Sequence, residues 1–285
     1  MKKIGFIDYY LDQWHANNYP QMIRESVFKN RFDVVLAWAE IEPEGKKSTD
    51  QWCAEQKVAK AASIEEVVEQ CDCLVVLAPN NAERHDDLAD LPLKSGKPVY
   101  IDKPIAPSLA AARRLFEKAE KYGTPMMSSS ALRFGSALEK AIKETINGQA
   151  VRFAATRGDG IFPIYAIHLV EMLVMLLGAG ARQVMQCGTE HAPLMLVDYA
   201  DGRRGVVNLF PSHPYQISVQ YADKESLVID VMDDFFPRFI EAMLAFFESG
   251  RSPVPKEQTL EIAALIEAGI AALRTPDRWL PVCGQ

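Results

Sequence analysis

A lysine stands where a buried parallel strand is expected to end. Lys103 follows the apolar residues 99–101 and precedes Pro104, whose ring favours an extended backbone at the residue before it. A lysine held over a partly dry pocket loses hydration, which favours its neutral form. It could then take a proton from a hydroxyl group, or return one. The alternative is a surface lysine beside a turn, which the position alone would favour.

A histidine lies inside the most apolar stretch of the chain, residues 161–181. Tyr165 and Glu171 stand three residues before and after His168, so a helix would place all three on one face. Such a trio could relay a proton or hydrogen-bond a substrate. A histidine packed in the core is a close alternative. A metal bound by His168 and Glu171 is a weaker one, because no third ligand is in view.

The same stretch is not expected to span a membrane. His168 and Glu171 lie near its middle and Pro163 near its start, and a charged centre is expensive in lipid. We therefore expect a buried helix of a soluble protein that has no membrane partner.

Composition and charge limit the number of domains, the kinds of partner and the redox setting that we expect. The 285 residues are enough for two domains. The net charge of −7 and the pI near 5.4 argue against nucleic acid or an anionic membrane as the main partner. The five cysteines are odd in number and suit no zinc motif, so no metal site is expected and a reduced, cytoplasmic setting fits. The first strand should begin at residue 2, so no signal peptide is expected before it.

Apolar runs and helical segments alternate through residues 1–124. This alternation predicts βαβ units and an α/β, Rossmann-like, doubly wound parallel sheet. Ser63 and Ser108 stand where two of the helices should begin, and Gly123 where one should end. Residues 49–63 are ambiguous. Strands are expected at 3–7, 32–39, 73–80, 97–104 and from 124, and helices at 12–27, 63–70, 82–96 and 108–123.

The pattern changes after residue 124. Several short strand candidates follow one another, and Asp201-Gly202 between two of them is a strong hairpin signal. Clustered strands with short turns predict an α+β domain over residues 125–285, built on an open, mostly antiparallel sheet. Helices are expected there at 135–147, over the apolar stretch to 177, at 233–249 and at 256–273.

A series of short motifs runs through the first domain at fixed spacing. A strand ends in Ala78-Pro79-Asn80, His85 follows, then Gly-Lys-Pro-Val at 96–99, and then Asp-Lys-Pro at 102–104. This series resembles the Gfo/Idh/MocA-type oxidoreductases, in which the last motif is usually Glu-Lys-Pro. The family's second domain is an open antiparallel sheet, which matches the change of pattern. The resemblance therefore covers nearly the whole chain.

The resemblance implies an NAD(P)-dependent oxidoreductase that acts on a sugar, a polyol or a related hydroxylated small molecule. Lys103 would be the acid/base group, assisted by His168 and Tyr165, while hydride moves to or from a nicotinamide. A homo-oligomer, either dimer or tetramer, is expected through an apolar face of the open sheet. The residues that would bind NAD or NADP are Ile7, Asp8, Tyr9, Tyr10, Glu40, Pro79, Asn80, His85, Asp102 and Lys103.

Two positions depart from the family's pattern. The family usually has a G-x-G-x-x-G-type turn after the first strand, and this chain has no glycine from Phe6 through Gln13. The family commonly has an Asp four residues before the histidine of the apolar helix, and this chain has Ile164 there.

The glycine-free turn makes cofactor binding an open question. A pyrophosphate needs small residues and free N–H groups at a helix N-terminus. We expect Asp12 to be the N-cap of the first helix and Asp8 to add a like charge. Two poorly solvated anions would oppose a bound anion by on the order of several kcal/mol. Tyr9 and Tyr10 would obstruct close approach, so either NAD(P) binds in an altered pose or the site serves another ligand.

Other polar residues have two interpretations each. Trp14 and His15 suit a sugar ring or polyol, or belong to an ordinary helix with Trp14 packed inside. Asn80 could bond the cofactor or stabilise an Asx-turn. Residues that could hold a substrate hydroxyl or carboxylate, or form ordinary ion pairs, are Arg133, Arg157 and Glu171.

Two further functions stay open beside the oxidoreductase. The glycine-free turn and the absent Asp fit a non-redox ligand-binding or regulatory homologue on the same scaffold. A lyase or epimerase would use Lys103 and His168 for proton abstraction. The sequence does not name the substrate.

Overall fold

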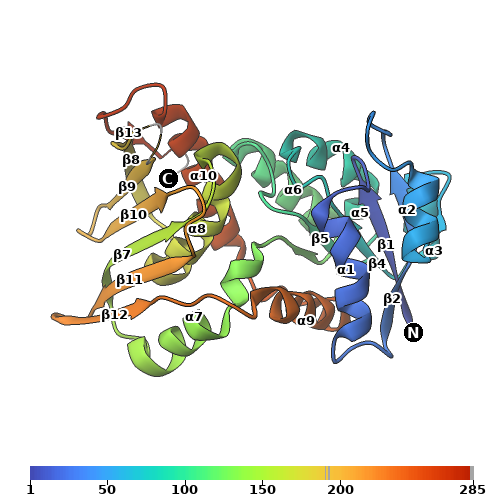
Figure 1. The fold of residues 1–285 in the computed structure, drawn as a ribbon, viewed down its shortest axis with the longest axis horizontal. Coiled ribbons are helices and arrows are strands. Elements are labelled where there is room, and N and C mark those ends of the chain that lie inside the picture. The colour runs from blue at the N-terminus through green and yellow to red at the C-terminus, as the bar shows by residue number, and fades with distance from the viewer. Residues whose placement is uncertain (190, 192, 283–285) are drawn as a thin grey trace. The chain divides into compact units, whose positions relative to one another are not determined.

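A computed structural model describes residues 1–189, 191 and 193–282 of the chain. The chain forms two compact units (Figure 1). Unit 1 comprises Met1–Ser129 and Phe239–Val254, and unit 2 comprises Ser130–Arg238 and Pro255–Gln285. A single boundary at residue 124 therefore differs from the structure, because the segment from Phe239 to Val254 returns to unit 1. Cys283, the last of the five cysteines, lies outside the described residues.

Unit 1 is built on a six-stranded sheet with the order β3-β2-β1-β4-β5-β6, in which every pair is parallel. The predicted Rossmann-like sheet is thus confirmed. Its central strands are buried on both faces, as a parallel sheet requires. The strands are β1 (Lys2–Asp8), β2 (Phe32–Ala39), β3 (Ala59–Lys60), β4 (Cys73–Val76), β5 (Val99–Ile101) and β6 (Met126–Met127).

Helices connect these strands. The segment that the sequence left ambiguous forms α2, and Ser48 and Gln51 make a capping box at its start. The helices are α1 (Trp14–Glu25), α2 (Thr49–Gln56), α3 (Ile64–Gln70), the 3₁₀ turn η1 (Ala82–Arg84), α4 (His85–Leu88), α5 (Asp90–Lys94) and α6 (Leu109–Tyr122).

The predicted ends of two helices are confirmed. The Ser63 hydroxyl accepts from the backbone N–H of Glu66 at the start of α3, and the Ser108 hydroxyl accepts from Ala111 N at the start of α6. Gly123 ends α6 with a φ of 64°. The predicted helix over 82–96 is wrong in detail, because it breaks into three short pieces. Pro92 lies inside it and has no N–H to donate to the preceding turn.

Helix α9 (Phe235–Ser249) supplies the returning segment of unit 1. The Phe239 ring lies 5.8 Å from the Tyr19 ring and 5.4 Å from the Tyr100 ring, measured between centroids. Phe247 lies 6.4 Å from Phe32. These aromatic contacts join α9 to α1, β2 and β5, so α9 contributes to the core of unit 1.

Unit 2 is built on a seven-stranded sheet with the order β12-β11-β7-β10-β9-β8-β13. The sheet is antiparallel except for the pair β7 and β10, so the predicted mostly antiparallel sheet is confirmed. Asp201-Gly202 lies in the hairpin between β9 and β10, with Gly202 at φ 86°. The strands are β7 (Val151–Gly158), β8 (Ala181–Gln186), β9 (Leu194–Tyr199), β10 (Arg204–Leu209), β11 (Gln216–Tyr221), β12 (Glu225–Ile229) and β13 (Leu280–Pro281).

Two long helices cover one face of this sheet, α8 (Phe162–Leu177) and α10 (Lys256–Ala272) (Figure 1). A Cβ atom on Gly205 of β10 would lie 2.8 Å from a methyl carbon of Leu173, so only glycine lets α8 approach so closely. No helix in the described part of the chain combines the length and apolarity that a membrane crossing needs. The shorter helices are the 3₁₀ turn η2 (Ala131–Phe134), α7 (Ser136–Lys140) and the π-helical η3 (Ala141–Ile146).

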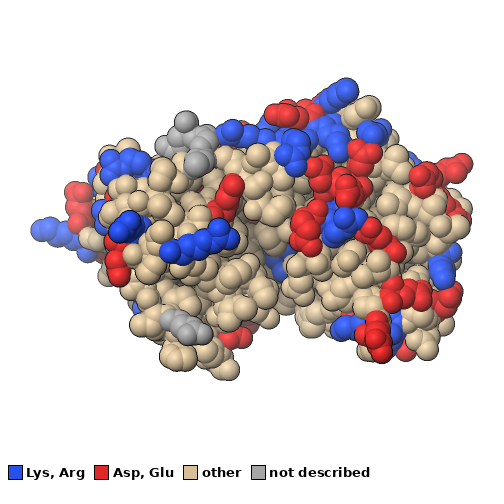
Figure 2. Space-filling view, turned by 90° about the horizontal axis from the view of Figure 1, so that it is seen from above, with Lys and Arg blue, Asp and Glu red and all other residues tan. Residues whose placement is uncertain are grey.

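Charged side chains of both signs are mixed on the face of the molecule shown in Figure 2. That face shows no broad field of positive charge, in keeping with the net charge of −7.

Candidate functional site

The polar residues of unit 1 gather at the carboxyl edge of its sheet. Asp8 is the last residue of β1, Glu40 follows β2, Pro79 follows β4 and Asp102 follows β5. The strand order β2-β1-β4-β5 places these four ends side by side. Ligands of doubly wound sheets bind at this edge.

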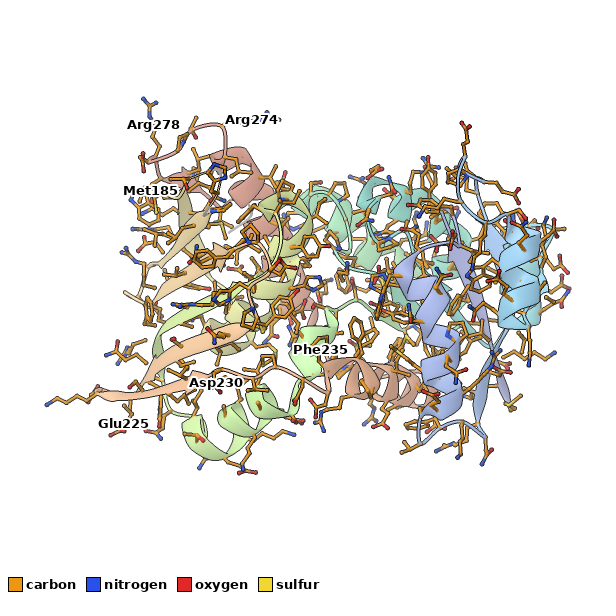
Figure 3. All side chains as sticks on the ribbon, in the orientation of Figure 1. Met185, Glu225, Asp230, Phe235, Arg274 and Arg278 are labelled. Carbon is orange, nitrogen blue, oxygen red and sulfur yellow. The ribbon has the colours of Figure 1, made fainter. Side chains whose placement is uncertain are left out.

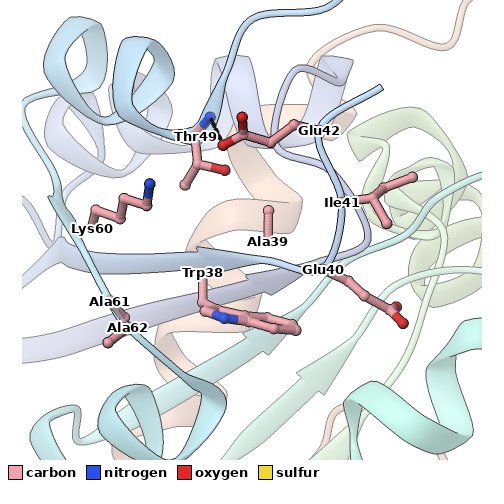
Figure 4. Close-up of a pocket in the computed structure, with 9 residues that line it drawn as sticks. All are labelled: Trp38, Ala39, Glu40, Ile41, Glu42, Thr49, Lys60, Ala61 and Ala62. Atoms are coloured by element: carbon pink, nitrogen blue, oxygen red, sulfur yellow. Dashed lines mark hydrogen bonds between the residues drawn. The ribbon is translucent and has the colours of Figure 1, made fainter. Parts of the chain in front are cut away.

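A pocket of about 280 Å³ opens at the end of β2 (Figure 4). On one side of it, the carboxylate of Glu42 accepts from the backbone N–H of Thr49 at 3.0 Å. The Lys60 ammonium also borders the pocket and pairs with Asp50 at 2.8 Å. The residues that line the pocket are Trp38, Ala39, Glu40, Ile41, Glu42, Thr49, Lys60, Ala61 and Ala62.

Glu40 lies at the rim of this pocket and is ion-paired. The guanidinium of Arg84 donates to both of its oxygens, and its Nε–Oε2 distance is 3.1 Å. The same guanidinium lies over the ring of Tyr9, 5.7 Å from its centroid. Arg84 therefore connects the end of β2 with the glycine-free turn, a contact that the sequence did not indicate.

The prediction that Asp12 caps the first helix is wrong. The helix α1 begins at Trp14, its N-cap is Gln13, and no side chain caps it. Asp12 instead accepts from the side-chain amide of Asn17 at 3.0 Å and from the backbone N–H of Lys47 at 3.2 Å. These hydrogen bonds, the Asn17 one first, hold the pKa of Asp12 below its usual value. The Asp12 carboxylate thus accepts hydrogen bonds from α1, through Asn17, and from the loop before α2, through Lys47.

Asp8 is fully buried and behaves differently from Asp12. Burial, reinforced by the charge of Asp102, raises its pKa well above the usual value, although backbone N–H groups of the turn act against the rise. Gln13 Nε2 donates to Asp8 Oδ1 at 3.4 Å, and Oδ2 has no hydrogen-bond partner among the described atoms. The two carboxyl groups of the turn are therefore not two equivalent anions.

Asp102 forms the centre of a buried polar cluster. His15 Nδ1 lies 3.4 Å from its Oδ2, and the Tyr100 hydroxyl donates to its Oδ1 at 3.0 Å. Burial acts to raise the pKa of Asp102, but its electrostatic interactions with His15, Lys103 and His85, together with a backbone hydrogen bond from Lys103, hold that pKa below the usual range. Burial lowers the pKa of His15. The structure thus places His15 against the Asp-Lys-Pro motif, whereas Trp14 beside it is half exposed.

His85 supports the backbone after Lys103. Its ring is fully buried, and Nδ1 lies 3.0 Å from the carbonyl oxygen of Ile105. Burial lowers its pKa, which favours a neutral ring. The contact fixes the turn of Lys103, Pro104 and Ile105, in which the Lys103–Pro104 peptide bond is cis. Lys103 itself is 8% exposed, so it is not the surface lysine of the alternative interpretation.

The Gly-Lys-Pro-Val motif has a structural role in this chain. Lys97 Nζ donates to the carbonyl oxygens of Val68 at 2.5 Å and Cys71 at 2.7 Å, at the end of α3. A cation there satisfies carbonyl groups that a helix leaves unpaired. Asn80 lies exposed in the turn closed by the Asn81 N–H and the Ala78 carbonyl at 2.9 Å. Ala78 adopts a φ of 92°, an unusual value for a residue with a side chain.

Unit 2 brings a second set of predicted residues together around His168. Its Nδ1 lies 2.7 Å from the hydroxyl of Ser130. Glu171, one turn further along α8, accepts from Ser130 N at 3.3 Å and pairs with the buried guanidinium of Arg133. Arg133 also donates to Gln258 Oε1 at 2.8 Å. Arg133 and Glu171 are thus partners of each other.

The remaining predicted residues of unit 2 lie further out. The Tyr165 ring is 6.1 Å from the His168 ring, and 39% of Tyr165 is exposed. Arg157 is exposed on β7. Tyr215 approaches His168 from the loop before β11, with 6.2 Å between the ring centroids. Among the described residues, no three His, Cys, Asp or Glu side chains gather as metal ligands.

The comparisons with known proteins agree with this arrangement. Residues 10–129 match the model of an oxidoreductase family described as having an NAD-binding Rossmann fold. The family that this model describes is that of the Gfo/Idh/MocA oxidoreductases. The resemblance inferred from the motifs is thus confirmed. The expected cofactor, a nicotinamide dinucleotide, is also the cofactor of the family that matches.

A curated relative is the uncharacterized oxidoreductase YhhX of Escherichia coli (strain K12). It is 28% identical over 134 residues, which cover 41% of this chain and 39% of that protein. The chain spans about half or less of the length of the curated relatives that it matches.

Solved structures share the fold of the whole chain. The scyllo-inositol dehydrogenase from Lactobacillus casei, with bound NAD(H) and scyllo-inositol, has a TM-score of 0.80, 13% identity, and 99% coverage of both chains. GenD2 from gentamicin A biosynthesis, in complex with NAD, has a TM-score of 0.79 and 14% identity, covering 99% of this chain and 97% of that one. At these identities the likeness concerns the fold.

Proposed function

We propose that the protein is an NAD-dependent dehydrogenase acting on a secondary hydroxyl group of a sugar, a polyol or a related small molecule. The observation that carries the proposal is the polar carboxyl edge of the unit 1 sheet. There a pocket at the end of β2 and the buried Asp102-Lys103 pair occur in a segment of the NAD-binding family. The inositol dehydrogenase that shares the fold supports the substrate class.

The pocket at the end of β2 fits the adenosine end of a dinucleotide. An acidic residue after the second strand bonds the ribose hydroxyls in Rossmann folds, and Glu40 has that position. Glu42 adds a second carboxylate, while the Lys60 ammonium is already paired with Asp50. A 2′-phosphate would meet two carboxylates there, so we propose NAD rather than NADP.

Two sets of contacts at the glycine-free turn support dinucleotide binding there. Asp12 is bonded to Asn17 and Lys47, and Asp8 is buried with a raised pKa. Arg84 and Lys46 lie over the rings of Tyr9 and Tyr10, at 5.7 Å and 5.9 Å from the ring centroids. Two cations therefore lie at the glycine-free turn, and one of them, Arg84, is already paired with Glu40. Their charge supports binding of a pyrophosphate, which Tyr9 and Tyr10 would hold away from the backbone.

Bound NAD supplies the acceptor for a hydride from the carbon that carries the substrate hydroxyl. Lys103 takes the proton of that hydroxyl, and we assign His168 the assisting role that the resemblance implies. His85 and Asp102 position Lys103 through the backbone and through charge. The products are a ketone and the reduced nicotinamide.

One observation favours a second candidate, a non-redox homologue that binds a polyol. The turn after β1 has no glycine, and two tyrosines stand in the place of the close backbone approach. On this alternative the pocket at the end of β2 would bind no dinucleotide.

A fluorescence titration separates the two candidates. Trp38 lines the pocket, so binding of NADH should quench tryptophan emission and transfer energy to the nicotinamide. We expect saturation by NADH below ~1 mM and much weaker binding of NADPH. A lack of saturation with either cofactor would favour the non-redox candidate.

The variant Glu40→Arg tests whether the pocket at the end of β2 selects between NADH and NADPH. It removes the ribose acceptor and adds a cation for a 2′-phosphate, so the preference should move from NADH toward NADPH. Glu83→Arg, at an acidic position in the adjoining η1 turn and outside the pocket, is the control and should leave the preference unchanged.

A further inference from the structure

His15, in the first turn of α1, is a polar side chain that contacts the Asp-Lys-Pro motif. Its Nδ1 lies 3.4 Å from Oδ2 of Asp102, the residue directly before Lys103. Its ring packs against two aromatic rings of the same helix, 5.5 Å from Trp14 and 5.2 Å from Tyr19 between centroids. All of these residues belong to unit 1.

The two atoms that face each other have no competing partner. His15 Nδ1 and Asp102 Oδ2 are buried, and neither makes a hydrogen bond within the described part of the chain. The other oxygen of Asp102 accepts from the Tyr100 hydroxyl at 3.0 Å. At 3.4 Å the contact is slightly longer than a normal hydrogen bond, and catalytic hydrogen bonds often tighten only when substrate binds. Because an unpaired buried polar atom is costly, each atom favours the other as its partner.

The direction of this contact follows from the charge of Asp102. The neighbours of Asp102 hold its pKa below the usual range, so its carboxylate is ionised at neutral pH and only accepts hydrogen bonds. Nδ1 of His15 must therefore carry the hydrogen. Burial, with a further contribution from the charge of Lys103, lowers the pKa of His15 against the attraction of Asp102. The ring is therefore neutral and carries a single hydrogen.

The second nitrogen of the His15 ring is then a free proton acceptor. In the neutral Nδ1–H form, Nε2 carries a lone pair. Nδ1 is buried, whereas Nε2 is not enclosed and no hydrogen bond joins it to a described residue. The side chain as a whole is 12% exposed. A carboxylate that orients a histidine through one nitrogen and leaves the other free is the arrangement of an acid–base dyad.

We propose that Asp102 and His15 form such a dyad, in which Asp102 orients the ring and Nε2 of His15 accepts the proton that Lys103 releases. The inference rests on the proposed role of Lys103 in the dehydrogenase. Oxidation of the substrate sends a hydride to NAD and the hydroxyl proton to Lys103. The ammonium group of Lys103 gives this proton to His15, and His15 releases it to water. Lys103 is then neutral for the next turnover.

Lys103 lies near enough to the dyad to share a proton with it. Asp102 and Lys103 are adjacent in the chain, with about 3.8 Å between consecutive Cα atoms, and the charge of Lys103 acts on both Asp102 and His15. Since like charges repel, one proton on either Lys103 or His15 is favoured over a proton on both. The other titratable groups that interact with Asp102 are Asp8 at the end of β1, Tyr19 of α1, His85 of α4 and Tyr100 of β5.

The first test is nitrogen NMR of the protein labelled with ¹⁵N-histidine, without cofactor or substrate. The signals of His15 among the five histidines are assigned with the variant His15→Gln. We expect the neutral wild-type ring to show a protonated Nδ1 and an unprotonated Nε2. A neutral wild-type ring that is protonated on Nε2 would overturn the proposal.

A carboxylate variant tests whether Asp102 orients the ring. The amide of Asp102→Asn can present either its oxygen or its NH₂ group to Nδ1, so the second tautomer should increase several-fold. Asp50→Asn removes an exposed carboxylate of α2 that pairs with Lys60, and it should leave the His15 signals unchanged. An unchanged tautomer in a folded Asp102→Asn protein would count against the dyad.

Kinetics with an added base separate proton transfer from a structural role. His15→Ala should lower kcat by roughly 10-fold with little change in KM, less than the ~10²–10⁴-fold that removal of an acid–base group costs. Imidazole in the assay should restore the rate several-fold, because a free base can take the place of the missing ring. His191→Ala, at an exposed histidine before β9, should keep the wild-type rate with and without imidazole. A His15→Ala protein with the wild-type kcat, or with a loss that imidazole does not restore, would refute the proton transfer.

The dyad and the proposed function fail separately. If the protein binds no nicotinamide but His15 shows the expected tautomer, the proposed function fails and the dyad stands. If turnover is confirmed and the neutral ring carries its hydrogen on Nε2, the dyad fails and the proposed function stands.

Discussion

At the scale of single residues, two buried carboxyl groups at the same sheet edge behave in opposite ways. Asp102 has cationic and imidazole neighbours that hold its pKa down, whereas Asp8 meets burial and the charge of Asp102. Their environments thus shift the two pKa values in opposite directions. The acidic turn is therefore compatible with an anionic ligand.

The variant Asp8→Asn should stabilise the protein as pH rises. The pKa of the Asp8 carboxyl group is higher in the folded protein than in the unfolded chain. Such a group stabilises the fold at a pH below its pKa in the unfolded chain, and this stabilisation is lost as the pH rises through its pKa in the folded protein. The amide has no such loss. Urea unfolding of both proteins should show a difference that grows as the pH rises above the unfolded pKa of an aspartate, about 3.9. A difference that shrinks with pH would contradict the burial argument.

Replacement of Lys103 should abolish most turnover without unfolding the protein. A general acid–base group contributes ~10²–10⁴-fold, so Lys103→Ala should lower kcat with NAD and a polyol substrate by about that factor. Lys121→Ala, at an exposed lysine near the end of α6, is the matched control. Equal rates for the two variants would remove Lys103 from the mechanism.

The sequence predicted on which elements Lys103, His168 and Glu171 lie better than it predicted their contacts. The carboxyl-edge position of Lys103 and the shared face of His168 and Glu171 follow from local periodicity, which needs only a strand and a helix. The contacts of Ser130 with His168 and of Arg84 with Glu40 join residues 38 and 44 positions apart. Local patterns carry no information on such pairs. Three consecutive serines at 128–130, after the last parallel strand, were the only local signal for Ser130.

At the scale of elements, the start of α1 shows why the prediction of Asp12 as the N-cap was wrong. An acidic residue near a helix start usually indicates a cap, but the helix begins one residue later, and Gln13 is the N-cap. Asp12 bonds instead to the loop that precedes α2, through Lys47 N. The boundary of a helix is settled by tertiary partners that propensity does not include.

The ion pair between Arg133 and Glu171 links η2 to α8 and should be important for stability. Both side chains are almost fully buried. Removal of one partner leaves an uncompensated charge, so Glu171→Ala should lower the free energy of unfolding by about 3–5 kcal/mol. Urea denaturation measures this, and Glu257→Ala, at an exposed glutamate of α10, should change it by less than ~0.5 kcal/mol.

At the scale of the whole molecule, α8 and α10 cover one face of the sheet of unit 2, and within the described part of the chain no such helix pair covers the other face. Cross-strand pairing aligns a mostly apolar row on the second face, in which Met185, Leu196, Val206, Ala155, Ser218 and Val228 follow one another. Figure 3 labels Met185 of β8 on the side away from these helices. We propose that a second copy of the chain covers this row, as the resemblance implied.

A charge in the row should prevent self-association. Val206→Arg places a cation in the middle of the face, so a wild-type dimer should become a monomer in sedimentation experiments. Val27→Arg, at an exposed valine of unit 1, is the matched control and should stay dimeric. A wild-type protein that is monomeric at all concentrations would refute this interface.

The change in strand pattern predicts two units. It does not predict that the segment Phe239–Val254, which follows most of unit 2 in the sequence, belongs to unit 1. Residues 233–249 predict a helix from their apolar periodicity, and α9 confirms it. Its assignment to unit 1 depends on Phe239 and Phe247 contacting Tyr19 and Phe32. Aromatic residues far apart in sequence decide that packing, and periodicity does not indicate which partner a helix face will meet.

A crystal structure of the protein with NADH tests the central claim most directly. The account predicts the adenosine in the pocket at the end of β2, with its ribose against Glu40, and the nicotinamide ring within reach of Lys103. The pyrophosphate should lie beside Tyr9 and Tyr10 without contact to the Asp12 carboxylate. A structure in which NADH is absent at saturating concentration, or lies away from this edge of the sheet, would contradict it.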